Sequence, residues 1–113
     1  MVIEIGGKKL QGIDMLQLRK SYIEIGKLVQ RNGYGQYNGI LNILMGQIKC
    51  IDSKENIEEK IQYLTDGYSR IFLTRGSLGD FVIYDENLEV RNQLNVKYNE
   101  EVKKIWEIMK QYI

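Results

Sequence analysis

Four segments of the chain repeat apolar side chains at steps of three and four residues, and this spacing constrains the fold more than any other feature of the sequence. It places the apolar side chains of each segment on one face of a helix. We therefore expect helices over residues 15–31, 37–51, 57–71 and 99–113. The side chains that define them are Met15, Leu18, Tyr22, Ile25 and Val29; Tyr37, Ile40, Leu41, Leu44, Met45, Ile48 and Ile51; Ile57, Ile61, Leu64, Tyr68 and Ile71; and Val102, Ile105, Trp106, Met109, Tyr112 and Ile113.

Polar residues next to these segments predict where the helices begin. Asp14 with Gln17, and Asp52 with Glu55, have the spacing of capping boxes at the starts of the first and third helices. Asn99 is the expected N-cap of the last helix, because an asparagine side chain accepts hydrogen bonds from the first free N–H groups of a helix.

Glycines mark two further features of the helical segments. The first helix should end at Asn32-Gly33. Gly67 lies inside the third helix, where a glycine costs roughly 1 kcal/mol relative to alanine. The helix therefore either bends at Gly67 or packs there so closely that no side chain fits, and the sequence leaves both explanations open.

Two short β-hairpins are expected beside the helices. Gly6-Gly7 follows the apolar residues within 2–5 and precedes residues 8–10. This pattern predicts two strands joined by a tight turn. Residues 81–84 form a β-prone run that ends at the polar residues 85–87, and residues 88–90 could return as its partner strand.

The expected fold is mainly α, of the α+β class, and forms a single globular domain over residues 1–113. About four helices should pack as an antiparallel, bundle-like core with one or two short β-hairpins at its edge. The antiparallel arrangement follows from the short connections between the first three helices, which leave no room for a crossover.

Charge and composition exclude several classes of function. The chain carries 16 basic and 15 acidic residues, so it lacks the basic excess that direct binding to nucleic acid usually requires. It has no histidine and one cysteine, Cys50, which excludes His-based metal sites, internal disulfides and Ser-His-Asp catalysis. It shows neither a membrane-spanning apolar stretch nor a signal-peptide pattern. We expect a cytoplasmic protein that uses no cofactor and does not contact a membrane.

The segment 76–80, Gly-Ser-Leu-Gly-Asp, is the most unusual local feature of the sequence. In one interpretation its backbone N–H groups and Ser77 form an anion nest, which with Arg75 and Asp80 would bind an anionic substrate in a concave pocket. In the other, the glycines supply turn conformations while Ser77 and Asp80 accept hydrogen bonds from the backbone of the loop itself. We expect the second, because the segment matches no phosphate-binding motif.

The longer stretch 72–83, Phe-Leu-Thr-Arg-Gly-Ser-Leu-Gly-Asp-Phe-Val-Ile, resembles a segment of small bacterial immunity-type proteins of polymorphic and contact-dependent growth inhibition toxin systems. The family segment reads Gly-Gly-Met-Gly-Ser-Phe/Leu-Asn-Asp-Leu-Val. This chain departs from it at Thr74, Arg75 and Gly79. The positions that match are Gly76, Ser77, Leu78, Asp80 and Phe81.

The order of elements over about residues 15–110 also resembles that family. Two helices with an aromatic residue at the turn between them precede the segment, and Tyr34 or Tyr37 represents that aromatic here. An Asn-initiated helix follows it. The resemblance implies a binding function, in which the protein blocks a cognate toxin domain and catalyses no reaction of its own.

Acidic residues are concentrated in the second half of the chain, which contains twelve acidic and nine basic residues. A toxin that cleaves nucleic acid carries a basic surface, which an inhibitor would complement with carboxylates. Acids in the first turn of a helix also suit its dipole without any partner, and that explanation stays open. The candidate partner-binding carboxylates are Asp52, Glu55, Glu58, Glu59, Asp66 and Asp80.

Tyrosine is abundant, with eight copies beside one tryptophan, and both residue types dominate the energetics of protein interfaces. Tyr34, Tyr37 and Tyr84 fall at expected turns or ends and should be exposed for a partner, whereas Tyr22, Tyr68 and Trp106 lie on apolar stripes and should be buried. The alternative to an inhibitor is a non-catalytic adaptor or homodimeric module of a phage or mobile element. The sequence does not give the oligomeric state.

Overall fold

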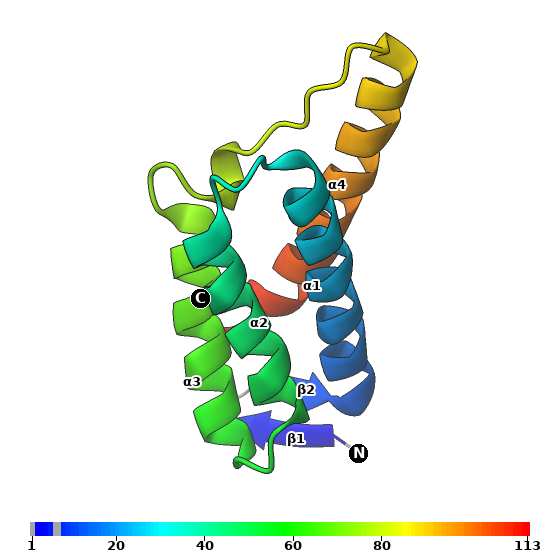
Figure 1. Cartoon of the computed structure of the whole chain (residues 1–113). Coiled ribbons are helices and arrows are strands. Elements are labelled where there is room, and N and C mark those ends of the chain that lie inside the picture. Colours follow the sequence, from blue (N-terminus) through cyan, green and yellow to red (C-terminus); the bar gives the residue numbers. More distant parts are fainter. Residues whose placement is uncertain (1, 6–7) are drawn as a thin grey trace.

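The structure, a computed structural model, describes residues 2–5 and 8–113, with side chains from Asp14 onward. In that part of the chain four α-helices form a compact globule (Figure 1): α1 (Gly12–Asn32), α2 (Asn38–Asp52), α3 (Ile57–Tyr68) and α4 (Leu88–Met109). Two shorter helical segments follow α3, the π-helix η1 (Ser69–Leu73) and the 3-10 helix η2 (Leu78–Asp80). At the N-terminus β1 (Val2–Ile5) and β2 (Lys8–Gln11) pair antiparallel. The Gly-Gly turn expected between them lies outside the described residues.

Helix α1 is the centre of the packing. It packs against both α2 and α4. Helix α3 packs against α2 and also contacts α4, where the ring of Tyr68 lies near that of Trp106. Neighbouring helices run in opposite directions, as Figure 1 shows for α1 beside α2 and for α1 beside α4. The expected set of about four helices is confirmed. No helix in the described ranges is both long enough and apolar enough to cross a bilayer.

The core is built from the apolar stripes that the sequence shows. Tyr22 and Ile25 of α1, and Ile105 of α4, are completely buried, and Tyr68 of α3 is nearly so. Burial of one such side chain contributes roughly 1.5–3 kcal/mol. Trp106 was expected in the core, but its side chain is 41% exposed, and its ring lies 6.1 Å from that of Tyr68 at the edge of the core.

The second expected hairpin is wrong. Residues 88–90 form the first turn of α4, because Asn87 rather than Asn99 is the N-cap and its Oδ1 accepts the N–H of Val90 at 3.1 Å. Residues 81–85 run as an extended stretch (Figure 1), but they belong to no sheet. Within the range 14–113 the structure contains no strand.

The expected capping boxes are also wrong. Helix α1 begins at Gly12, which places Asp14 inside its first turn. Asp52 is the last residue of α2, and α3 is capped instead by Asn56, whose Oδ1 accepts the N–H of Glu59 at 2.9 Å. Ser53 and Glu55 lie in the connection between these helices. The expected end of α1 is confirmed, since the N–H of Gly33 donates to the carbonyl of Val29 at 2.7 Å.

Gly67 is explained by close packing. A β-carbon at this position would overlap the side-chain amide of Gln47, which comes from the facing side of α2. The Gln47 side chain is itself buried, so a methyl group at position 67 would have to displace it. The absence of a side chain at Gly67 therefore allows α2 and α3 to approach each other.

We predict that Gly67→Ala lowers the free energy of unfolding by about 1–3 kcal/mol, because the added methyl group overpacks the α2–α3 contact. Gly39→Ala is the matched control, since a β-carbon at Gly39, also in a helix, would meet no atom within 4 Å. This control should raise the stability by up to about 1 kcal/mol. Chemical denaturation measures both, and equal stability of the two variants would contradict the packing explanation.

Candidate functional site

The structure does not bring the candidate binding residues into one patch. Tyr34 precedes α2 and Asp52 ends it, so these two residues lie at opposite ends of a helix that is about 22 Å long at 1.5 Å per residue. Most of the acidic candidates surround the α2–α3 connection, while the tyrosine candidates lie at the other end of the molecule, near the α1–α2 turn (Figure 1). Asp66 stands apart from both groups, exposed on α3.

In the loop 74–80, the polar groups bond to one another. Ser77, only 1% exposed, accepts the N–H of Gly79 on its Oγ at 3.3 Å, and Asp80 accepts the N–H of Gly76 at 3.3 Å. The N–H groups of Ser77 and Asp80 donate to the carbonyls of Thr74 and Ser77, both at 3.1 Å. Because the loop's own oxygens use these donors, the geometry favours turn chemistry over an anion nest.

The same loop is anchored on the core. Leu78 is buried, and its carbonyl accepts the hydroxyl of Tyr98 from α4 at 2.7 Å. A β-carbon at Gly79 would overlap the carbonyl of Phe72, so only glycine fits there. Gly76 has a φ of +75°, the left-handed region that favours glycine. The segment therefore fixes the start of the extended stretch that follows, and Arg75 stays exposed beside it.

Asp52 is engaged within the chain. Its two carboxylate oxygens accept hydrogen bonds from Nε and Nη2 of Arg19 at 2.8 and 3.1 Å, which ties the end of α2 to α1. Hydrogen bonding to Arg19 and the charge of its guanidinium lower the pKa of Asp52. The sequence gives no sign of this pair, because the two residues are 33 positions apart.

Glu55, Glu58 and Glu59 are exposed at the α2–α3 connection and in the first turn of α3. A hydrogen bond to Glu59, together with its negative charge, raises the pKa of Glu55. These two carboxylates also border a hollow of about 490 Å³, lined further by Gly46, Lys49, Cys50, Ser53 and Tyr63. The cause of this raised pKa is the closeness of the two carboxyl groups.

The tyrosine candidates separate into two exposed residues and one packed residue. Tyr34 is 79% exposed and Tyr84 61% exposed, as expected. The expectation that Tyr37 is exposed is wrong, because it is half-buried and its ring lies edge-on to that of Phe81, with centroids 5.1 Å apart. This contact brings the extended stretch 81–85 against the α1–α2 turn.

Between the two exposed tyrosines lies a hollow of about 340 Å³, lined by Tyr34, Tyr84, Asp85 and Glu86. We call this the tyrosine hollow. Asp85 and Glu86 were not among the expected site residues. They follow Tyr84 directly in the sequence, but nothing in the sequence indicates that the α1–α2 turn faces them.

One residue of α4 holds this stretch in place. The side chain of Asn95 accepts the N–H of Ile83 at 2.9 Å and donates to the carbonyl of Ile83 at 2.8 Å. The side chains of Phe81 and Ile83 are thereby buried, while those of Val82 and Tyr84 point outward. Asn95 therefore positions this stretch, although no local pattern in the sequence marks it as a functional residue.

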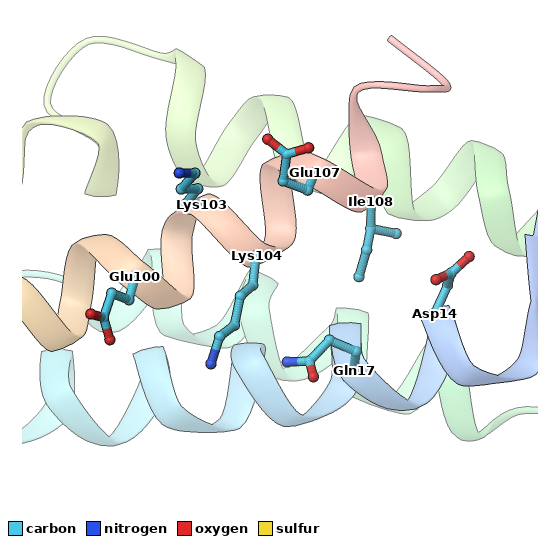
Figure 2. Close-up of a pocket in the computed structure, with 7 residues that line it drawn as sticks. All are labelled: Asp14, Gln17, Glu100, Lys103, Lys104, Glu107 and Ile108. Carbon is cyan, nitrogen blue, oxygen red and sulfur yellow. The ribbon is translucent and has the colours of Figure 1, made fainter.

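A further hollow, of about 450 Å³, lies between α1 and α4 (Figure 2). Its rim carries charges of both signs, and two of them are engaged within α4: Lys104 with Glu101 at 3.1 Å and Glu107 with Lys110 at 2.6 Å. It contains none of the expected binding residues, and its mixed charges favour neither an anionic nor a cationic ligand. The lining residues are Asp14, Gln17, Glu100, Lys103, Lys104, Glu107 and Ile108.

Among the described residues, no three or more potential metal ligands of the His, Cys, Asp and Glu types come together. The sequence matches no family model, and searches of curated proteins and of solved structures give no significant match. The functional interpretation therefore depends on the residues of this chain.

We predict that Asp52→Asn lowers the free energy of unfolding at pH 7, because it breaks the ion pair with Arg19. The folded-state pKa of Asp52 lies below its ordinary value, so the pair stabilises the protein above about pH 3.9 and this contribution disappears as the pH falls through the lowered pKa. Urea denaturation at pH 7 and near pH 2 measures the difference between variant and wild type.

Asp66→Asn is the control for this measurement, because Asp66 is also exposed and lies on the neighbouring helix α3. It should be as stable as the wild type at both pH values. A difference for Asp52→Asn that persists at the acidic pH would contradict the role of the ion pair.

Proposed function

We propose that this chain is an immunity protein, an antitoxin-like inhibitor that binds and neutralises a cognate bacterial toxin domain by covering its active site or an essential surface. The observation that carries the proposal is the exposed pair Tyr34 and Tyr84 at one end of the molecule. Large amphipathic side chains that stay mostly exposed are typical of a surface that binds another protein.

Of the two tyrosines, Tyr34 gives the stronger support for an external contact. Its φ of +53° lies in the left-handed region, which is unfavourable by about 1–2 kcal/mol for a residue with a β-carbon. With 79% of its surface exposed, the side chain gains little burial energy to offset that strain. Glycine would serve this turn better, as it does at the neighbouring Gly35, so the tyrosine side chain is explained by a contact outside the chain.

The acidic residues support the same partner. Asp85 and Glu86 border the tyrosine hollow, and Glu55, Glu58 and Glu59 add negative charge at the other end of the molecule. A toxin that acts on nucleic acid has a basic surface, which carboxylates attract and orient. A nuclease domain is the partner that this charge fits best.

The resemblance to immunity-type proteins agrees with this location. The matching segment around Gly76–Phe81 is anchored on α4 through Leu78, and the chain continues from it directly into Tyr84. The motif thus has a structural role, and the residues that it positions are the proposed contacts.

One observation favours the alternative of an adaptor or a homodimer. The first turns of α4 project beyond the rest of the molecule (Figure 1), and Leu88 and Val96 there are more than half exposed. Exposed apolar side chains on a projecting helix suit a helix from a second protein or a second copy.

Co-expression tests the proposal. We predict that the gene immediately upstream encodes a protein with a toxic C-terminal domain. This chain should restore the growth of bacteria that produce that domain, and it should co-purify with it. The double variant Tyr34→Gly and Tyr84→Ala should lose both effects while it stays folded. Leu16→Ala, which truncates an exposed side chain on α1 outside the candidate surfaces, should keep both.

Absence of a complex with the neighbour's domain would contradict the inhibitor function. A stable dimer of the chain alone in light scattering, with no toxin complex, would support the homodimer. Retention of rescue by the double variant would show that the tyrosines are not the interface.

A further inference from the structure

The tyrosine hollow combines two aromatic rings with two carboxylates, a combination that suits a planar cationic side chain. We propose that the hollow receives an arginine side chain of the partner protein. The identification of that partner as a toxin rests on the proposed function, but the chemistry of the hollow depends only on its own lining residues, Tyr34, Tyr84, Asp85 and Glu86.

The carboxylates favour a cation. Among the described residues that line the hollow, Asp85 and Glu86 are the charged ones, and both are negative. The orientation of Asp85 is fixed, because its Oδ1 accepts the N–H of Asn87 at 2.8 Å. A guanidinium group can donate two hydrogen bonds in parallel to a carboxylate, which an ammonium group does with less geometric fit.

The aromatic rings favour a planar cation. The molecule already contains such a contact, since the guanidinium carbon of Arg91 lies 5.4 Å from the centroid of the Tyr84 ring. Arg91 comes from α4 and is not among the residues that line the hollow. Because an aromatic ring has two faces, Tyr84 can contact one guanidinium from α4 and a second from a partner.

The hollow is also formed before any partner arrives. Asn95 holds Ile83 on both its N–H and its carbonyl, and the packing of Phe81 on Tyr37 joins the stretch 81–85 to the α1–α2 turn. The two walls of the hollow are therefore linked through the core. A preformed site loses less conformational entropy on binding than one that must assemble.

Arginine is favoured over the other occupants that carboxylates attract. A lysine has no planar group to stack on tyrosine, and a metal ion would leave both rings without a role. An arginine uses the rings and the carboxylates together. A toxin that binds nucleic acid carries such arginines on its surface.

The test is an NMR titration of the labelled chain with the peptide acetyl-Gly-Arg-Gly-amide. The matched peptides contain citrulline, which has nearly the same shape without the charge, or lysine. We expect saturable shifts of the backbone amides at 34–36 and 84–86 with the arginine peptide, and binding that is weaker by roughly fivefold or more with each of the other two.

The variants Tyr34→Gly and Tyr84→Ala should each weaken binding of the arginine peptide by roughly fivefold. Glycine is chosen at position 34 because it accepts the positive φ. Leu16→Ala, which truncates an exposed side chain on α1 that lines none of the described hollows, should leave binding unchanged. Equal binding of the citrulline or the lysine peptide, shifts confined to other surfaces, or no saturable shift would overturn the proposal.

The peptide titration and the co-expression experiment test the two proposals separately. If the arginine peptide binds as expected but no toxin is neutralised, the hollow is an arginine site and the immunity function is wrong. If the chain neutralises the toxin but the peptide does not bind, the immunity function is supported and the arginine proposal is wrong.

Discussion

The side-chain amide of Asn95 determines how the second half of the chain is arranged. It satisfies both backbone polar groups of Ile83, and its amide nitrogen also donates to the carbonyl of Arg91 at 2.9 Å within α4. A buried backbone N–H or carbonyl requires a partner, which a neighbouring strand would normally supply. Here one asparagine on a helix supplies it, so an extended segment can bury Ile83 without belonging to a sheet.

This arrangement connects three parts of the molecule to α4. Phe81 packs between Tyr37, near the α1–α2 turn, and Tyr98 of α4, with ring centroids 5.1 and 5.2 Å away. The hydroxyl of Tyr98 holds the loop at Leu78. The alternation of buried and exposed side chains along 81–84 then places Tyr84 outside, opposite Tyr34. The candidate interface thus follows from how the buried side chains and backbone groups of this region are packed and hydrogen-bonded.

The sequence predicts the helices well where their apolar stripes are continuous. It finds the body of α1, α2 and α3 from steps of three and four residues. It misses the first half of α4 because this part projects from the core, so that Leu88, Val90 and Val96 follow no single buried face. Asn95, a polar residue, lies on the side of this half that faces the stretch 81–85, where it interrupts an apolar repeat. Both features hide helical periodicity.

The candidate site is less predictable, because its parts are far apart in the sequence. Exposure of Tyr34 and Tyr84 follows from their places at turns, but the hollow between them depends on the fold. Long-range contacts also explain why the expectations for Tyr37 and Asp52 were wrong. Tyr37 is packed by Phe81, and Asp52 is paired with Arg19; neither partner is near in the sequence. Local patterns show which residues suit a contact, whereas long-range packing determines whether they are free to make it.

Amide hydrogen exchange at residues 82–84 tests the central role of Asn95 most directly. Among the described residues, Ile83 has an acceptor for its N–H, the Oδ1 of Asn95, while the N–H groups of Val82 and Tyr84 have none. We predict slow exchange at Ile83 and fast exchange at Val82 and Tyr84, with the protection of Ile83 lost in Asn95→Leu. Fast exchange at Ile83 in the wild type, or protection of Val82 and Tyr84 as in a paired strand, would contradict this account.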